Sequence, residues 1–179
     1  MKKLVILLSL VAMLFAFVGC ATKAAAGTTV YVDEWWNNVP ADTSEFHYEV
    51  GYAKGTNLQT SRDWAKANAN QNLAQYISNT IDSIVVTYTN DAGELATDNM
   101  QSLQAFESVS KQRAEATLTG VTYKFHENED GSVYVLASLP IGPLAEDLKE
   151  TMQESFSRNK ASEAAMSDMN AAIDKYFSN

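Results

Sequence analysis

The chain has 179 residues, 46% of them hydrophobic, with a formal net charge of −9 and a single cysteine. This charge disfavours nucleic acid as a partner, because binding a phosphate backbone requires clustered Lys and Arg. It also disfavours attachment to anionic lipid through the protein surface alone, so we expect the negative charge to serve solubility. One cysteine excludes an internal disulfide framework.

The first nineteen residues have the form of a secretory signal. Lys2 and Lys3 precede an apolar run from Leu4 to Val18 that only Ser9 interrupts. A basic start, a short apolar segment and a small residue before the cut are typical of an exported protein. The run of about fifteen apolar residues is shorter than the roughly 20 that a membrane-spanning helix needs. We therefore expect residues 1–19 to be removed.

Cys20 follows the small residue Gly19 directly, and residues 17–20 (FVGC) resemble the lipobox of bacterial lipoproteins. The resemblance implies a diacylglycerol on the Cys20 sulfur, cleavage between Gly19 and Cys20, and usually an acyl chain on the new amine. Phe17 departs from the leucine usual at its position. Stable anchoring takes two or more membrane signals, and these chains together supply them. Ala21, in place of an aspartate, favours the outer membrane.

Two other interpretations of this region explain the position of Cys20 less well. A buried or stray thiol does not explain why the lone cysteine ends the apolar segment. Cleavage after the small residues 24–26 would release a soluble protein and leaves the position of Cys20 unexplained. We therefore expect residues 20–29 to be a lipidated cysteine with a flexible tether, followed by one domain over 30–160 and a C-terminal helical extension over 161–179.

The first expected elements are an aromatic entry segment, a strand and a long helix. The entry segment covers residues 30–40 and ends at proline, and alternating apolar residues predict a strand over 46–53. The sequence Thr60 to Asp63 has the form of a capping box at a helix start. The expected buried stripe of this helix, spaced by four and three, is Ala65, Ala69, Leu73, Ile77, Ile81 and Ile84, widened by Trp64, Ala74 and Tyr76.

Beyond Ser83 the β-branched composition predicts that the helix gives way to a strand over 84–89. A second helix is expected over 98–118, with Gly120 at its C-cap. Alternating residues over 121–126 and 133–139 flank a polar turn and predict a hairpin.

After Pro140 and Gly142 stop the hairpin, apolar spacing predicts a helix from Pro143 and a last helical stretch, with a break near 157–162. The sequence thus predicts an α+β fold with the order β-α-β-α-β-β-α(α). In this two-layer fold, helices pack on one face of a mostly antiparallel sheet.

Several of these features, in order, resemble the LPP-twenty family of small bacterial lipoproteins, which includes the flagellar lipoprotein FlgP. The features are the lipobox cysteine, a Trp-to-Pro segment, a Gly-aromatic-Ala strand end at 51–53, the alanine-rich helix, Ser110-Lys111-Gln112, Leu118 to Gly120, and the acidic hairpin turn with residues 133–136. The resemblance implies a protein of the cell envelope, sometimes tied to flagellar assembly, with no established catalytic residues.

No constellation of residues predicts catalysis, a metal site or a cofactor. The two histidines, His47 and His126, lie far apart in sequence and lack an evident serine, carboxylate or second ligand. The turn 126–131 matches a calcium loop only at Asn128, Asp130 and Gly131, and Ala137 stands where the bidentate glutamate belongs. We expect a plain acidic turn.

Trp35 and Trp36 are the candidate interaction residues. Adjacent residues of an extended chain face opposite ways, so we expect one tryptophan to pack and the other to lie near the surface. Packing over one edge of the core is the simpler role, and an interface anchor is the other.

These features favour a non-catalytic envelope protein with protein partners or copies of itself, and no small-molecule ligand. Two alternatives stay open: a carrier of lipid or another ligand, which needs an enclosed cavity, and a small hydrolase, which needs a cleft with a perturbed carboxylate or histidine.

Overall fold

The structure is a computed structural model that describes residues 34–92, 95–116, 118 and 120–178. The chain divides into two units, residues 1–34 and a compact unit over 35–179, and the fold is that of the second. The predicted signal, Cys20 and the tether over 20–29 lie outside the described residues.

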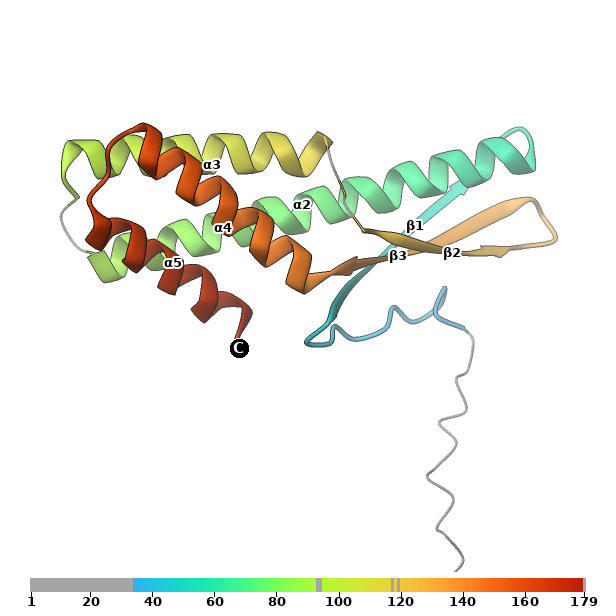
Figure 1. The fold of residues 1–179 in the computed structure, drawn as a ribbon. Coiled ribbons are helices and arrows are strands. Elements are labelled where there is room, and N and C mark those ends of the chain that lie inside the picture. Colours follow the sequence, from blue (N-terminus) through green and yellow to red (C-terminus); the bar gives the residue numbers. More distant parts are fainter. Residues whose placement is uncertain (1–33, 93–94, 117, 119, 179) are drawn as a thin grey trace, which may run out of the picture. The chain divides into compact units, whose positions relative to one another are not determined.

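The described residues form helices and strands in the order β-α-α-β-β-α-α (Figure 1). The elements are β1 (Phe46–Lys54), α2 (Leu58–Ala92), α3 (Thr97–Ala116), β2 (Thr122–Glu127), β3 (Ser132–Pro140), α4 (Ile141–Arg158) and α5 (Glu163–Phe177). The predicted α+β class is confirmed, and the sheet is antiparallel with strand order β1-β3-β2.

The helix α2 has 35 residues, which at 1.5 Å per residue is about 52 Å long. Its N-terminal part lies along the sheet, and its C-terminal part lies beside α3 and α5 (Figure 1). The predicted stripe from Ala65 to Ile84 is buried. Trp64, which was expected to widen that stripe, is instead 54% exposed.

The prediction of a strand over 84–89 is wrong, because α2 continues as a helix to Ala92. Ile84 and Tyr88 extend the buried stripe at helical spacing, and their packing outweighs the β-propensity of the segment. The hydroxyls of Thr87 and Thr89 donate to the carbonyls four residues earlier, so the β-branched residues are also accommodated within the helix.

The N-terminus of α2 is capped by Asn57 and not by the predicted box at Thr60. The backbone N–H of Thr60 donates to Asn57 Oδ1 over 2.9 Å. Asparagine is among the preferred N-cap residues, so the helix begins three residues earlier than the box predicts.

Two asparagines of α2 also close the free edge of β1. Asn68 Nδ2 donates to the Tyr52 carbonyl over 2.7 Å, and Asn72 Nδ2 donates to the Val50 carbonyl over 3.0 Å. These backbone oxygens belong to an edge strand, whose unpaired groups invite pairing with another chain. The two amides therefore make the β1 edge less available to another strand.

The C-terminal part of α2 forms a ring of four helices with α3, α4 and α5, in which each neighbouring pair is joined by an ion pair. The pairs are Lys111–Asp82, Arg113–Glu154, Lys149–Asp174 and Lys175–Asp91, at 2.6, 3.0, 2.7 and 3.2 Å. Such exposed pairs contribute at most about 1 kcal/mol each, so the buried side chains supply most of the packing.

The last helix belongs to this same core. Four residues of α5 are buried: Ala165, Met169, Ala172 and Ile173. The stretch expected as a C-terminal extension over 161–179 therefore packs as part of the compact unit. Among the helices that the structure describes, none combines the length and the apolar composition needed to cross a membrane.

Candidate functional site

The sheet has one face against α2 and one face turned away from it, which we call the outer face. The register places Tyr52 opposite Tyr134, and Tyr134 opposite His126. Side chains alternate along a strand, so these three share one face. The neighbouring Gly51 has the backbone of α2 directly beside it, which identifies its face as the inner one.

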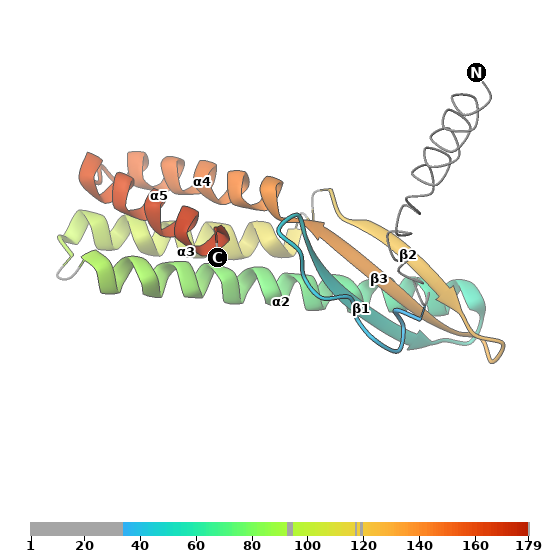
Figure 2. The ribbon, with the colours of Figure 1, turned by 90° about the horizontal axis from the view of Figure 1, so that it is seen from below.

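Residues 35–45, which comprise the described end of the entry segment and the loop that follows it, cross the outer face of the sheet (Figure 2), and from here on we call this stretch the entry segment. Trp36 stacks flat on His126, with ring centroids 3.5 Å apart and planes 5° apart. Trp35 meets both of these rings edge-on, at 5.8 and 6.4 Å. Trp35 is 7% exposed and Trp36 is half-buried, so one tryptophan packs and the other lies nearer the surface, as the sequence predicts.

More aromatic side chains continue this surface along the strands. Tyr52 and Tyr134 have ring centroids 4.8 Å apart, and those of Phe46 and Tyr48 are 6.3 Å apart. Tyr52 is 46% exposed, and Val39 of the entry segment is 47% exposed. We call the following set the aromatic surface: Trp36, Phe46, Tyr48, Tyr52, His126 and Tyr134.

The strands place their carboxylates away from the aromatic surface. Glu127 pairs with Arg62 of α2, so it lies on the inner face. Glu49 also lies on the inner face, because it alternates with Val50 and shares the face of Gly51, and it contacts His47 there. The outer face carries Lys54 and Lys124 by the same alternation. The outer face of this acidic protein therefore has no acidic side chain from a strand.

Lys54 pairs with Asp130 of the β2–β3 turn over 3.0 Å. Asp130 Oδ1 accepts hydrogen bonds from the hydroxyl and from the backbone N–H of Ser132, at 2.6 and 3.0 Å. The pKa of the Asp130 carboxyl is held well below its ordinary value, mainly by the hydrogen bond from the Ser132 hydroxyl. The hydrogen bonds from the Ser132 backbone N–H and from Lys54 lower it further. The carboxylate thus braces the turn.

His47 lies on the inner face, and His126 lies on the outer face, so the sheet separates the two histidines. The His47 ring contacts Asp42 through Nδ1 at 2.7 Å and Glu49 through Nε2 at 3.3 Å. It also stacks on Tyr76 of α2, whose phenol pKa is raised by burial. With both ring nitrogens occupied, His47 serves to fasten Asp42 of the entry segment to the fold.

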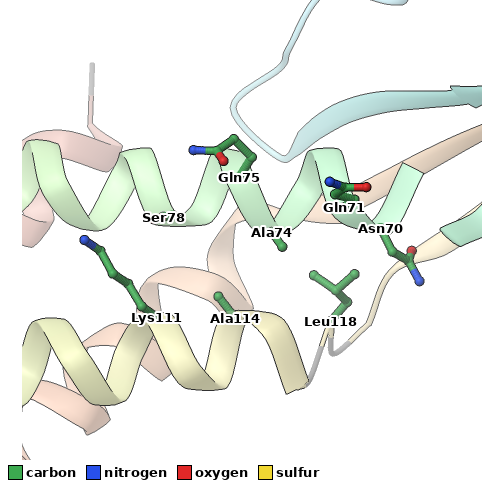
Figure 3. A pocket seen from close by; sticks show the side chains of 8 residues that line it. All are labelled: Asn70, Gln71, Ala74, Gln75, Ser78, Lys111, Ala114 and Leu118. Carbon is green, nitrogen blue, oxygen red and sulfur yellow. The ribbon is translucent and has the colours of Figure 1, made fainter. Parts of the chain in front are cut away.

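A groove of about 560 Å³ lies between α2 and α3 (Figure 3). The side chains that line it are Asn70, Gln71, Ala74, Gln75, Ser78, Lys111, Ala114 and Leu118. Hydrogen bonds to Asp82 and Glu107 raise the pKa of Lys111, so its ammonium stays charged in the groove. The groove is open and mostly polar.

Sequence reasoning identified the two tryptophans but missed the rest of the aromatic surface and the groove. The alternation of Phe46, Tyr48 and Tyr52 predicts a strand, but it does not indicate which face of the sheet these side chains occupy. Across residues 34–92, 95–116, 118 and 120–178, no three His, Cys, Asp or Glu side chains gather in a way that could hold a metal ion. No family model, curated protein or solved structure matches this chain.

Proposed function

We propose that this chain is a lipid-anchored protein of the bacterial envelope, held at the outer membrane through Cys20, that acts by contact as a structural or assembly module. Catalysis has no part in this proposal. The lipobox at 17–20 supports the anchor, and the LPP-twenty resemblance supports the envelope location and adds flagellar assembly to the processes to be tested.

The aromatic surface is the observation that carries the contact role. In a two-layer fold, the sheet face turned away from the helices is usually polar because water covers it. Here that face carries neighbouring aromatic rings, and one of them, Tyr52, is 46% exposed. Contiguous exposed apolar groups on a soluble domain mark interaction sites, and large aromatic side chains often anchor them.

The carrier and hydrolase alternatives have less support. The groove between α2 and α3 is open and lined by amides and the Lys111 ammonium, which suits an acyl chain poorly. A hydrolytic histidine needs a free nitrogen beside a nucleophile, whereas carboxylates occupy both nitrogens of His47. His126 is covered by Trp36 and contacts Asn128.

The anchor is tested by growing cells with a clickable fatty acid. We expect the wild-type chain to be labelled and Cys20→Ala to remain unlabelled and unprocessed, because the thiol accepts the lipid. Labelling that persists in Cys20→Ala contradicts the anchor. The contact role is tested by crosslinking in the envelope with mass spectrometry, alongside a panel of hydrolase substrates. Turnover abolished by one polar substitution contradicts the non-catalytic role.

A further inference from the structure

We propose that the aromatic surface docks on the lipid–water interface of the membrane that holds Cys20, so that the domain lies with the outer face of its sheet against the bilayer. This inference rests on the proposed lipid anchor and names the partner of the same surface. Its support comes from where the tether joins the domain, from the chemistry of the exposed rings and from the distribution of charge.

The tether joins the folded unit at the aromatic surface. Fourteen residues, 21–34, separate Cys20 from Trp35, and a chain of that length spans at most about 50 Å. Trp35 is the first residue of the compact unit, and its ring contacts Trp36 and His126. The lipid therefore holds this surface within about 50 Å of the bilayer, where weak contacts are favoured because the effective concentration is high.

The aromatic surface has the chemistry of an interfacial surface. Tryptophan and tyrosine are enriched at membrane–water interfaces, because each combines an apolar ring with a polar tip. Trp36, Tyr48, Tyr52 and Tyr134 provide four such side chains on the outer face, where Tyr52 is exposed and the other three are half-buried. This composition fits a headgroup region better than it fits the dry core of a permanent protein interface.

The strands also keep their carboxylates off the outer face. The chain has a net charge of −9, so most of its surface is repelled by anionic headgroups. The strands expose Lys54 and Lys124 on the outer face and keep Glu49 and Glu127 on the inner face. Lys54 is paired with Asp130 of the β2–β3 turn, so what favours the approach of this face to a lipid surface is that its strands carry no carboxylate there.

The three tryptophans allow a direct test in the lipidated, mature protein. One variant keeps only Trp36 (Trp35→Phe with Trp64→Phe), and the matched control keeps only Trp64 (Trp35→Phe with Trp36→Phe). Trp64 is 54% exposed on α2, in the layer behind the sheet. Both are reconstituted in phosphatidylcholine vesicles with and without brominated acyl chains, which quench tryptophan only at close range. We expect at least twofold quenching of Trp36 and none of Trp64.

A second pair of variants separates docking from anchoring. In the Trp36-only protein, Tyr52→Asp should abolish the quenching, because it places a carboxylate on the aromatic surface. Phe125→Asp is the control, since Phe125 is similarly exposed (42%) but lies on the inner side with Arg62 above its ring. It should leave the quenching intact.

The outcomes distinguish the two proposals. A chain that takes fatty acid on Cys20 but shows equal or no quenching of Trp36 and Trp64 overturns membrane docking and leaves the lipoprotein proposal standing. Crosslinking of Trp36 or Tyr52 to another protein in place of lipid quenching also overturns it. A chain that takes no fatty acid overturns the anchor itself.

Discussion

The imidazole of His47 lies flat on the phenol ring of Tyr76, with ring centroids 3.4 Å apart and planes 9° apart. The same imidazole contacts Asp42, whose other carboxylate oxygen accepts the backbone N–H of Tyr48. Tyr76 in turn belongs to α2. The contact therefore links three parts of the fold: the entry segment, the first strand and the long helix.

His47→Phe tests this link. Phenylalanine keeps a flat ring against Tyr76 but removes both nitrogens, so the free energy of unfolding should fall by about 1–2 kcal/mol. The Tyr48 amide should exchange its hydrogen faster, because Asp42 is no longer held against it. His126→Phe, on the other face, is the control and should leave that amide unchanged. Unchanged exchange in His47→Phe contradicts the link.

Gly51 is the point where the sheet comes closest to α2. A Cβ atom at this position would overlap the carbonyl oxygen of Ala65 and the backbone nitrogen of Ala69. Backbone cannot move aside as a flexible side chain can, so Gly51→Ala should cost about 3 kcal/mol or more, measured by urea unfolding.

Gly142→Ala is the matched control for that substitution. Gly142 lies in the first turn of α4 with open space around its Cβ position, so alanine there should raise stability by about 0.5–1 kcal/mol. Equal effects of the two substitutions would show that the strand and helix are not in close contact.

Leu73 is fully buried on the stripe of α2 that faces the core. Leu73→Asp should unfold the domain, because a large-to-small core change alone costs about 2–5 kcal/mol and the buried carboxylate adds to it. Typical domains are stable by only about 5–15 kcal/mol. Gln71→Asp, at an exposed position of the same helix, should keep the thermal midpoint near wild type. A Leu73→Asp midpoint within a few degrees of wild type would place the stripe on the wrong face.

The sequence predicted the elements well where pattern and composition agree. The strands at 46–53, 121–126 and 133–139 each lie within one residue of those observed, because alternation and turn residues indicate the same boundaries. Over 84–89 the two signals conflict. Val85, Val86 and Thr87 favour a strand, whereas Ile84 and Tyr88 continue the helical spacing, which buries both side chains in the core.

The aromatic surface could be predicted only in part, since it depends on contacts between distant segments. Trp36 and His126 are ninety residues apart, and their stacking follows from the path of the entry segment over the sheet. No local periodicity indicates that path. Likewise, the pairing of Tyr52 with Tyr134 requires the β1–β3 register, which the hairpin signal between β2 and β3 does not supply.

Acid should loosen the β2–β3 turn through Asp130. Its pKa is lowered in the folded protein, so its contribution is fully present above the ordinary value of 3.8 and is lost as the pH falls through the lowered native pKa. An NMR titration of the Asp130 carboxyl should place its midpoint below that of an unstructured aspartate. Ser132→Ala removes the hydroxyl that lowers the pKa most and should raise the midpoint, whereas a wild-type midpoint at the ordinary value contradicts the brace.

Val86 distinguishes the observed helix from the strand that composition favours. It is 57% exposed within α2, so its substitution changes backbone preference with little loss of packing. Alanine is a better helix former than valine by roughly 0.5 kcal/mol, whereas in a strand the preference is reversed. Val86→Ala should therefore raise the free energy of unfolding by a few tenths of a kcal/mol, measured by urea unfolding with an unchanged m-value. Val133→Ala is the control in a true strand and should lower it by about 1 kcal/mol or more, because Val133 is also fully buried. If Val86→Ala is destabilising by a similar amount, the segment 84–89 is not a helix in solution.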